Sequence, residues 1–198
     1  MSKRIFDICW VIIGLTLLSP LMLVITLWIK LDSRGPILFL QTRVGQFGKA
    51  FKIYKFRTMR VHADDGLHLT IGEDARITRS GHFLRKYKLD ELPQLFNVLR
   101  GDMSLVGPRP EVPEYVALYP DSIRNYVLSV PVGMTDYASI EFSNESEMLA
   151  TSEHPEIDYV EKILPIKLAY HQKYVSERSL YLDTVLILRT FKRILLAN

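Results

Sequence analysis

The chain has 198 residues, enough for one domain with a sizeable core, and 48% of them are hydrophobic. Its net charge of +3 is far from the dense basic surface of a nucleic-acid-binding protein, so no nucleic-acid partner is expected. The single cysteine excludes an intramolecular disulfide, and the five histidines are scattered, which argues against a zinc site.

An uncharged apolar segment runs from residue 8 to residue 29, and as a helix it would be about 33 Å long, enough for the hydrocarbon core. Two features argue against a simple crossing. Ser19-Pro20 lies in the middle of the segment, where proline removes a backbone hydrogen bond. Basic residues flank both ends, whereas a crossing helix carries them mainly on the cytoplasmic side. From these residues alone, a helix that re-enters the same side and a helix that crosses remain equal alternatives.

Two strands are predicted next, ILFLQTRV at 37–44 and AFKIYKFR at 50–57, joined as a β-hairpin by a turn with two glycines. Lys55 and Arg57 share one face of the second strand by its two-residue period. Either they bind an anion or they form a solvated strand face, and for the strand alone the solvated face is the commoner outcome.

The remainder of the chain predicts helices with few strands. A polar loop is expected at 61–75. The acidic pair is expected to cap a helix that ends at Gly101, with Leu92, Leu95, Phe96 and Leu99 as its apolar stripe. A loop with some strand character is expected at 131–142, and helices are expected at 78–87, 115–128, 156–174 and 180–196. The last helix either packs on the core, which we favour, or lies on a membrane surface.

Asp90 and Glu91 are the candidate catalytic residues. At a helix entrance both carboxylates can face one site, and Mg²⁺ prefers one or two carboxylates together with phosphate oxygens. Aspartate can also act as a covalent nucleophile. Arg109, between two prolines, could bind phosphate in a bidentate manner. For an isolated acidic pair, however, a helix cap bridged to Arg85 or Lys88 is the more frequent explanation.

Several motifs that follow one another along the chain favour a catalytic role of the acidic pair over a helix cap. They are Gly35-Pro36 with Phe39, Gln41, Arg43, Gly45 and Gly48, then KIYKFRTM at 52–59, DARIT at 74–78 with Gly81, Leu84 and Arg85, and LDELPQLFNVLRGDMSLVGPRPE at 89–111. With these motifs the chain closely resembles the bacterial sugar transferase family, the small monotopic phosphoglycosyl transferases. The resemblance covers residues 3–111 and returns more weakly at 180–183.

The resemblance implies a mostly helical α+β fold. It has an N-terminal re-entrant membrane helix broken at Ser19-Pro20, a small β-hairpin, and amphipathic interfacial helices around a cytoplasmic catalytic core. The expected division is a membrane helix at 1–31 and a catalytic domain at 32–198, which form one structural unit. The implied location is the bacterial inner membrane, with the site facing the cytoplasm.

The resemblance also implies a two-step reaction. Asp90 would attack the sugar-bearing phosphate of a UDP-sugar and release UMP, and a polyprenyl phosphate of the undecaprenyl type would then accept the phosphosugar. Asp90 and Glu91 would bind Mg²⁺, and Lys55, Arg57 and Arg109 would bind the diphosphate. Membrane lipid is a further expected partner, and a homodimer is a candidate assembly. The sequence does not specify the sugar.

The last third departs from the family pattern. PVGMTDYASIEF stands at 131–142 where the family has a Pro-Gly-(Ile/Leu)-Thr-Gly segment, and His171 replaces an acidic residue of a later Asp-x-x-Tyr element. No binding role is therefore assigned after Glu111. Two other functions remain as alternatives. A CDP-alcohol phosphotransferase would need a longer acidic motif and several spanning helices, and a non-catalytic membrane adaptor would keep the motif only as scaffold.

Overall fold

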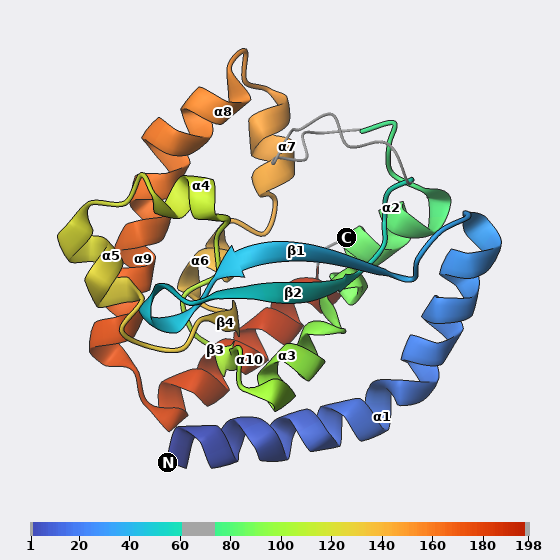
Figure 1. The fold of residues 1–198 in the computed structure, drawn as a ribbon, viewed down its shortest axis with the longest axis horizontal. Coiled ribbons are helices and arrows are strands. Elements are labelled where there is room, and N and C mark those ends of the chain that lie inside the picture. Colours follow the sequence, from blue (N-terminus) through green and yellow to red (C-terminus); the bar gives the residue numbers. More distant parts are fainter. Residues whose placement is uncertain (1, 61–73, 197–198) are drawn as a thin grey trace.

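A computed structural model describes residues 2–60 and 74–196 of the chain, so most of the predicted loop at 61–75 lies outside the described residues. The β-hairpin crosses the middle of the molecule, and helices surround it (Figure 1). Helix α1 borders one side of this body, and the later helices α4 to α9 gather around the turn end of the hairpin (Figure 1). The protein is mostly helical, as predicted.

Helix α1 (Ser2–Asp32) contains the predicted apolar segment and, among the described residues, is the helix long and apolar enough to cross a membrane. Figure 1 shows that it changes direction between its two halves. Pro20 has no N–H for the Thr16 carbonyl, and the Ser19 hydroxyl donates to that carbonyl at 3.1 Å instead. Helical structure therefore continues through Ser19-Pro20, and the re-entrant topology stays a prediction.

The first turns of α1 are attached to the body of the protein by charged side chains. Asp7 is buried, and it accepts hydrogen bonds from the Ser104 hydroxyl at 2.8 Å and from Lys3 at 3.2 Å. Lys3 also pairs with Asp183 at 2.8 Å. Arg4 donates to two carbonyl groups in the last turn of α3 (Gln94–Arg100). These contacts fix the first turns of α1 against α3, Ser104 and Asp183.

Strands β1 (Leu38–Val44) and β2 (Ala50–Phe56) form the predicted antiparallel hairpin, with Leu38 opposite Phe56 and Val44 opposite Ala50. A 3₁₀ turn, η1 (Gln46–Gly48), lies between them. Gly48 has a φ of 77°, which glycine adopts without the steric cost of a β-carbon. The hairpin therefore has the boundaries and the turn that its sequence predicts.

A second, parallel pair of strands was not predicted: β3 (Ser104–Val106) beside β4 (Gly133–Thr135). Three residues are too few for an alternating pattern to be visible in the sequence. Short helices follow β4, namely α6 (Tyr137–Glu141) and α7 (Glu145–Ala150). The prediction of a loop with strand character at 131–142 is therefore confirmed for residues 133–135, which form β4. It is wrong for residues 137–141, which form α6.

Prolines lie inside two of the predicted helices, and one of them divides its helix. The helix expected at 115–128 is α4 (Pro113–Val116) and α5 (Asp121–Val127), because Pro120 cannot continue α4. The helix expected at 156–174 is a continuous run of α8 (Pro155–Asp158), a π turn (Tyr159–Ile163) and α9 (Leu164–Glu177), and Pro165 is the second residue of α9. The helical pattern was therefore correct in both places, and in the first Pro120 decided the boundary.

Helix α10 (Leu180–Leu195) matches the prediction for the last helix. Leu186 is fully buried against β3, so the helix packs on the core as favoured. Its opposite face exposes apolar side chains, namely Tyr181, Leu188, Phe191 and Leu195. Contact of that face with a membrane stays a prediction.

Candidate active site

Asp90 and Glu91 lie in a 3₁₀ turn, η2 (Leu89–Glu91), between α2 (Arg79–Lys86) and α3. Lys88 has a φ of 54°, a left-handed conformation that ends α2 and reverses the chain. Helix α3 begins only after Pro93 and has no side-chain cap. The prediction that Asp90 or Glu91 caps this helix is therefore wrong, because the tight turn places both carboxylates before the helix entrance.

Glu91 is held by two cations from distant parts of the chain. Lys55 on β2 donates to Oε1 at 2.9 Å. Arg109 donates from Nη1 to Oε2 at 3.2 Å and from Nη2 to Oε1, a bidentate pair. Burial by itself raises the pKa of Glu91, but Arg109 and Lys55 outweigh burial and hold that pKa well below its usual range. Glu91 is therefore a firmly ionised carboxylate, paired with neither Arg85 nor Lys88 in the described structure.

Asp90 has a different environment. It is 7% exposed, and its Oδ1 atom has no hydrogen-bond partner among the described residues. Burial raises the pKa of Asp90, Lys55 opposes that rise, and the adjacent Glu91 adds to it. Arg85, whose Nε donates to the Thr58 hydroxyl at 2.9 Å, also favours the ionised form of Asp90. Asp90 thus has a buried oxygen without a partner and a raised pKa, whereas its neighbour has neither.

Helix α3 is fixed to the hairpin by Asn97, which is completely buried. Its side-chain oxygen accepts from the Tyr54 N–H at 2.9 Å, and its side-chain nitrogen donates to the Lys52 carbonyl at 2.7 Å. Asn97 therefore completes the free edge of β2 as another strand would. This inward turn of Asn97 changes the predicted apolar stripe: of its four residues, Leu95 is buried, Leu92 is half-buried, and Phe96 and Leu99 are exposed.

The segment that carries Arg109 is held on both sides. Gly107 lies so close to Gly133 that a β-carbon on Gly107 would be 2.3 Å from the Pro131 carbonyl oxygen. After Arg109, the Arg43 guanidinium donates to the Pro110 carbonyl at 3.1 Å and to Glu111 Oε2 at 3.3 Å. Close backbone packing and a buried ion pair thus fix the origin of the Arg109 side chain.

Glu111 is the centre of a buried polar network that the sequence pattern did not reveal. Its Oε1 accepts from the Tyr159 hydroxyl at 2.8 Å and from Lys167 at 3.0 Å, and Lys167 also pairs with Glu145 at 2.9 Å. Burial alone raises the pKa of Glu111, but Lys167 and Arg43 lower it to about 2. The partners come from segments outside the motif, so only the folded chain shows them together.

The predicted diphosphate-binding residues are not all in one place. Lys55 and Arg109 meet at Glu91. Arg57 is buried elsewhere, where it donates to the carbonyl groups of Ser33 and Arg34 at 2.7 and 3.0 Å. Arg57 thus fixes the loop after α1, and its binding of substrate stays a prediction.

The acidic pair also fits the predicted Mg²⁺ in its donor set. Asp90 has an unpartnered oxygen beside the ionised Glu91, and among the described residues no group of three or more metal-ligating side chains lies together. Two carboxylates completed by substrate phosphate oxygens are a usual arrangement for Mg²⁺. The metal itself stays a prediction.

His171, the residue that departs from the family pattern, is buried and lies 3.1 Å from the Asp136 carboxylate. Burial raises the pKa of Asp136, but His171 and the hydrogen bonds from Ser139 together lower that pKa below its usual value. Asp136 also caps α6, because its Oδ1 accepts from the Ser139 N–H at 2.8 Å. The pair therefore joins α6 to α9.

Comparison with known proteins gives a family match over nearly the whole chain: the model of the bacterial sugar transferase family matches residues 1–197. The chain is 38% identical over 196 residues to the UDP-N-acetylgalactosamine-undecaprenyl-phosphate N-acetylgalactosaminephosphotransferase of Aeromonas hydrophila. This alignment covers 98% of this chain and 43% of the relative. It is 39% identical over 199 residues to the UDP-glucose:undecaprenyl-phosphate glucose-1-phosphate transferase of Xanthomonas campestris pv. campestris. This alignment covers 98% of this chain and 39% of the relative. It is 54% identical over 109 residues to the exopolysaccharide production protein PSS of Rhizobium leguminosarum bv. phaseoli, covering 54% of each chain. The chain spans less than half the length of the first two relatives.

Proposed function

The chain belongs to the bacterial sugar transferase family, and we propose that it transfers a phosphosugar from a UDP-sugar to a polyprenyl phosphate. The products are UMP and a polyprenyl-diphosphate-sugar, the first membrane-bound intermediate of a bacterial glycan or polysaccharide. The names of two relatives support both substrates, since each includes a UDP-sugar and undecaprenyl phosphate. The family match also leaves a CDP-alcohol phosphotransferase without support.

In the proposed first step an Asp90 carboxylate oxygen attacks the phosphorus atom that carries the sugar. The bond from this phosphorus to the bridging oxygen breaks, UMP leaves with that oxygen, and the phosphosugar remains on Asp90 as an acyl phosphate. In the second step a phosphate oxygen of the polyprenyl phosphate attacks the same phosphorus. The Asp90–phosphorus bond then breaks, and the carboxylate is restored.

The observation that carries this proposal is the asymmetry of the acidic pair. A nucleophile needs an oxygen that is free to form a bond, and Asp90 Oδ1 has no partner among the described residues. Glu91 has both oxygens occupied by cations, so it suits a positioning role. Lys55 and Arg109 would neutralise the diphosphate if they shift from Glu91 toward substrate, which is the electrostatic contribution that dominates phosphoryl transfer. Mg²⁺ held by Asp90 and Glu91 would supply further charge neutralisation.

We also propose that the protein is monotopic in the bacterial inner membrane, with the site at the cytoplasmic surface. The apolar helix α1 supports attachment to a membrane. A UDP-sugar is water-soluble and a polyprenyl phosphate is membrane-bound, so the reaction requires a site at the boundary.

The test is a single-turnover experiment on the full chain in detergent, with UDP-N-acetylgalactosamine, UDP-glucose and UDP-galactose, Mg²⁺ and no lipid acceptor. We expect a near-stoichiometric burst of UMP with one sugar, and a phosphosugar adduct on Asp90 by peptide mass spectrometry. The Asp90→Asn variant should give neither. Asp121→Asn, an exposed aspartate on α5, is the matched control and should behave as the unchanged protein.

The other outcomes separate the alternatives. UMP release that needs polyprenyl phosphate and leaves no adduct would indicate direct transfer and exclude Asp90 as nucleophile. No release with any sugar of a wider panel, with or without acceptor, would favour the non-catalytic adaptor.

A further inference from the structure

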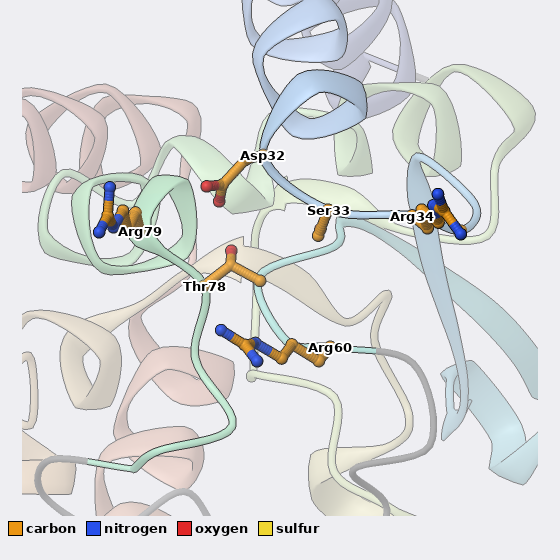
Figure 2. Close-up of a pocket in the computed structure, with 7 residues that line it drawn as sticks. Asp32, Ser33, Arg34, Arg60, Thr78 and Arg79 are labelled. Atoms are coloured by element: carbon orange, nitrogen blue, oxygen red, sulfur yellow. The ribbon is translucent and has the colours of Figure 1, made fainter.

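A pocket separate from the acidic pair lies where α1 ends and α2 begins. It has a volume of about 780 Å³ and is lined by Asp32, Ser33, Arg34, Gly35, Arg60, Thr78 and Arg79. Figure 2 shows Arg34 and Arg79 on opposite sides, with Thr78 and Arg60 between them. Neither the sequence motifs nor the proposed reaction gives this pocket a role.

The pocket is positively charged. Three arginines against one aspartate give its lining a net formal charge of +2. All three arginines are exposed, and within residues 2–60 and 74–196 none of them forms an ion pair with a carboxylate. The Oδ2 atom of Asp32 accepts from the backbone N–H and the hydroxyl of Ser80 at 2.9 and 2.8 Å. The arginines are therefore available to an external anion.

Apolar and aromatic side chains beside the pocket indicate its position relative to a membrane. Trp28 in the last turns of α1 contacts Phe83 of α2, with ring centroids 5.4 Å apart. Both rings are partly exposed, at 38% and 45%, and Leu31 is 88% exposed. Tryptophan side chains such as Trp28 collect at the level of lipid headgroups. Since α1 ends at Asp32, the pocket lies at the C-terminal end of the apolar helix, where the helix would leave the membrane in the arrangement proposed above.

We propose that this pocket binds the phosphate of an anionic membrane phospholipid. Guanidinium groups recognise phosphate oxygens by paired hydrogen bonds, and arginines from three separate segments, at 34, 60 and 79, line this one pocket. The lipid tails would lie along the exposed apolar face of α1. Such a contact fixes the depth of the protein in the bilayer, and it does not depend on the reaction proposed for Asp90.

The experiment measures thermal unfolding of the full chain in a neutral detergent at constant ionic strength. The probes are dihexanoyl phosphatidylglycerol, dihexanoyl phosphatidylcholine and glycerol 3-phosphate. The test variant is Arg60→Gln with Arg79→Gln. The control is Lys49→Gln with Lys52→Gln, which removes the same charge from exposed residues near the turn end of the hairpin.

We expect phosphatidylglycerol to raise the unfolding midpoint of the unchanged protein and of the control by about 2–4 °C, saturably, and the test variant to lose this shift. The proposal is overturned if the test variant keeps the shift, or if phosphatidylcholine gives the same shift as phosphatidylglycerol. An equal shift with glycerol 3-phosphate would also overturn it, since the site would then take a soluble phosphate. If the test variant does not fold, Arg34→Gln replaces it and should lose at least half of the shift.

Discussion

Arg109 binds Glu91 through both of its terminal nitrogens, while Asp90, the adjacent residue, keeps one carboxylate oxygen without a partner. Two neighbouring carboxylates thus have opposite environments. Cations hold the pKa of Glu91 well below its usual range, and burial raises the pKa of Asp90. Environments that move the pKa values of two carboxyl groups apart commonly give the two groups different roles in an active site.

Replacement of Arg109 by lysine should reduce turnover by about tenfold to a hundredfold, although the charge is conserved. Lysine has no planar pair of donors and cannot hold both oxygens of Glu91 in the same way. Arg124→Lys on α5 is the control, because Arg124 pairs with Asp121 at the surface. Initial rates with a saturating UDP-sugar would test the difference, and equal rates for the two variants would show that the bidentate geometry is unimportant.

Replacement of Lys55 by methionine should move the acid limb of the pH–rate profile to higher pH. Lys55 is the largest influence that lowers the pKa of Asp90, so its removal raises that pKa further. At a given acidic pH a smaller fraction of Asp90 is then ionised, and the rate of UMP release falls. The rate of the UMP burst, measured as a function of pH between 4 and 8, would show the shift.

Lys52→Met is the matched control for Lys55, since Lys52 is an exposed residue of the same strand that donates to the Thr42 hydroxyl. The acid limb of the pH–rate profile of Lys52→Met should coincide with that of the unchanged protein. An unmoved limb in Lys55→Met would mean that Asp90 does not set the acid dependence.

Local sequence patterns predicted the hairpin and the last helix well, because each depends on neighbouring residues. The two strands follow a two-residue period between turn residues, and α10 follows a helical pattern with Leu186 buried. The acidic pair and Arg109 could be selected by residue type and by family motif. Their mutual contact could not, because Glu91 and Arg109 are separated by α3 and β3.

Features that the periodic sequence patterns did not predict depend on contacts between residues far apart in the chain. Asn97 is polar yet completely buried, since it completes the edge of β2, and this contact changed the apolar stripe expected for α3. The two-residue period placed Arg57 on the same strand face as Lys55, but it did not reveal that the Arg57 guanidinium donates to the carbonyl groups of the loop after α1. Neither partner lies near its residue in the sequence, so periodicity contained no signal for them.

The Lys167→Met variant should destabilise the protein by about 3–5 kcal/mol at pH 7, because it removes the buried cation shared by the buried Glu111 and the half-buried Glu145. Glu111 has a folded-state pKa of about 2, below the usual value of 4.5, so its network contributes stability above about pH 4.5 and loses it as the pH falls toward 2. The variant should therefore lose most of the pH dependence of stability in that range. Denaturant unfolding in detergent between pH 3 and 7 would measure it.

Lys162→Met is the control for this network. Lys162 is an exposed residue that pairs with Asp158 at the surface, where solvent weakens the interaction. Its stability should be unchanged at every pH. If Lys167→Met were equally stable, the buried network would not contribute to folding.

The Gly107→Ala variant should lower both stability and turnover. A β-carbon at this position would lie 2.3 Å from the Pro131 carbonyl oxygen, so β3 and β4 must separate, and the following Arg109 moves with them. A loss of about 1–3 kcal/mol is expected for such overpacking. Gly14→Ala is the control, because its nearest neighbour would be 3.8 Å away. Native folding and full activity in Gly107→Ala would show that the close approach does not position Arg109.

The re-entrant topology predicts that both ends of α1 lie on the cytoplasmic side. In a Cys9→Ala background, Ser2→Cys and Pro36→Cys each place one cysteine at an end of the helix, and both should react with a membrane-impermeant maleimide only after cells are opened. Pro20→Leu restores a donor for the Thr16 carbonyl and should straighten the helix, so that the residue 2 cysteine becomes reactive in intact cells. Ser19→Ala keeps the proline and should keep the original pattern. Reaction of either end in intact cells carrying Pro20 would show that α1 crosses the membrane.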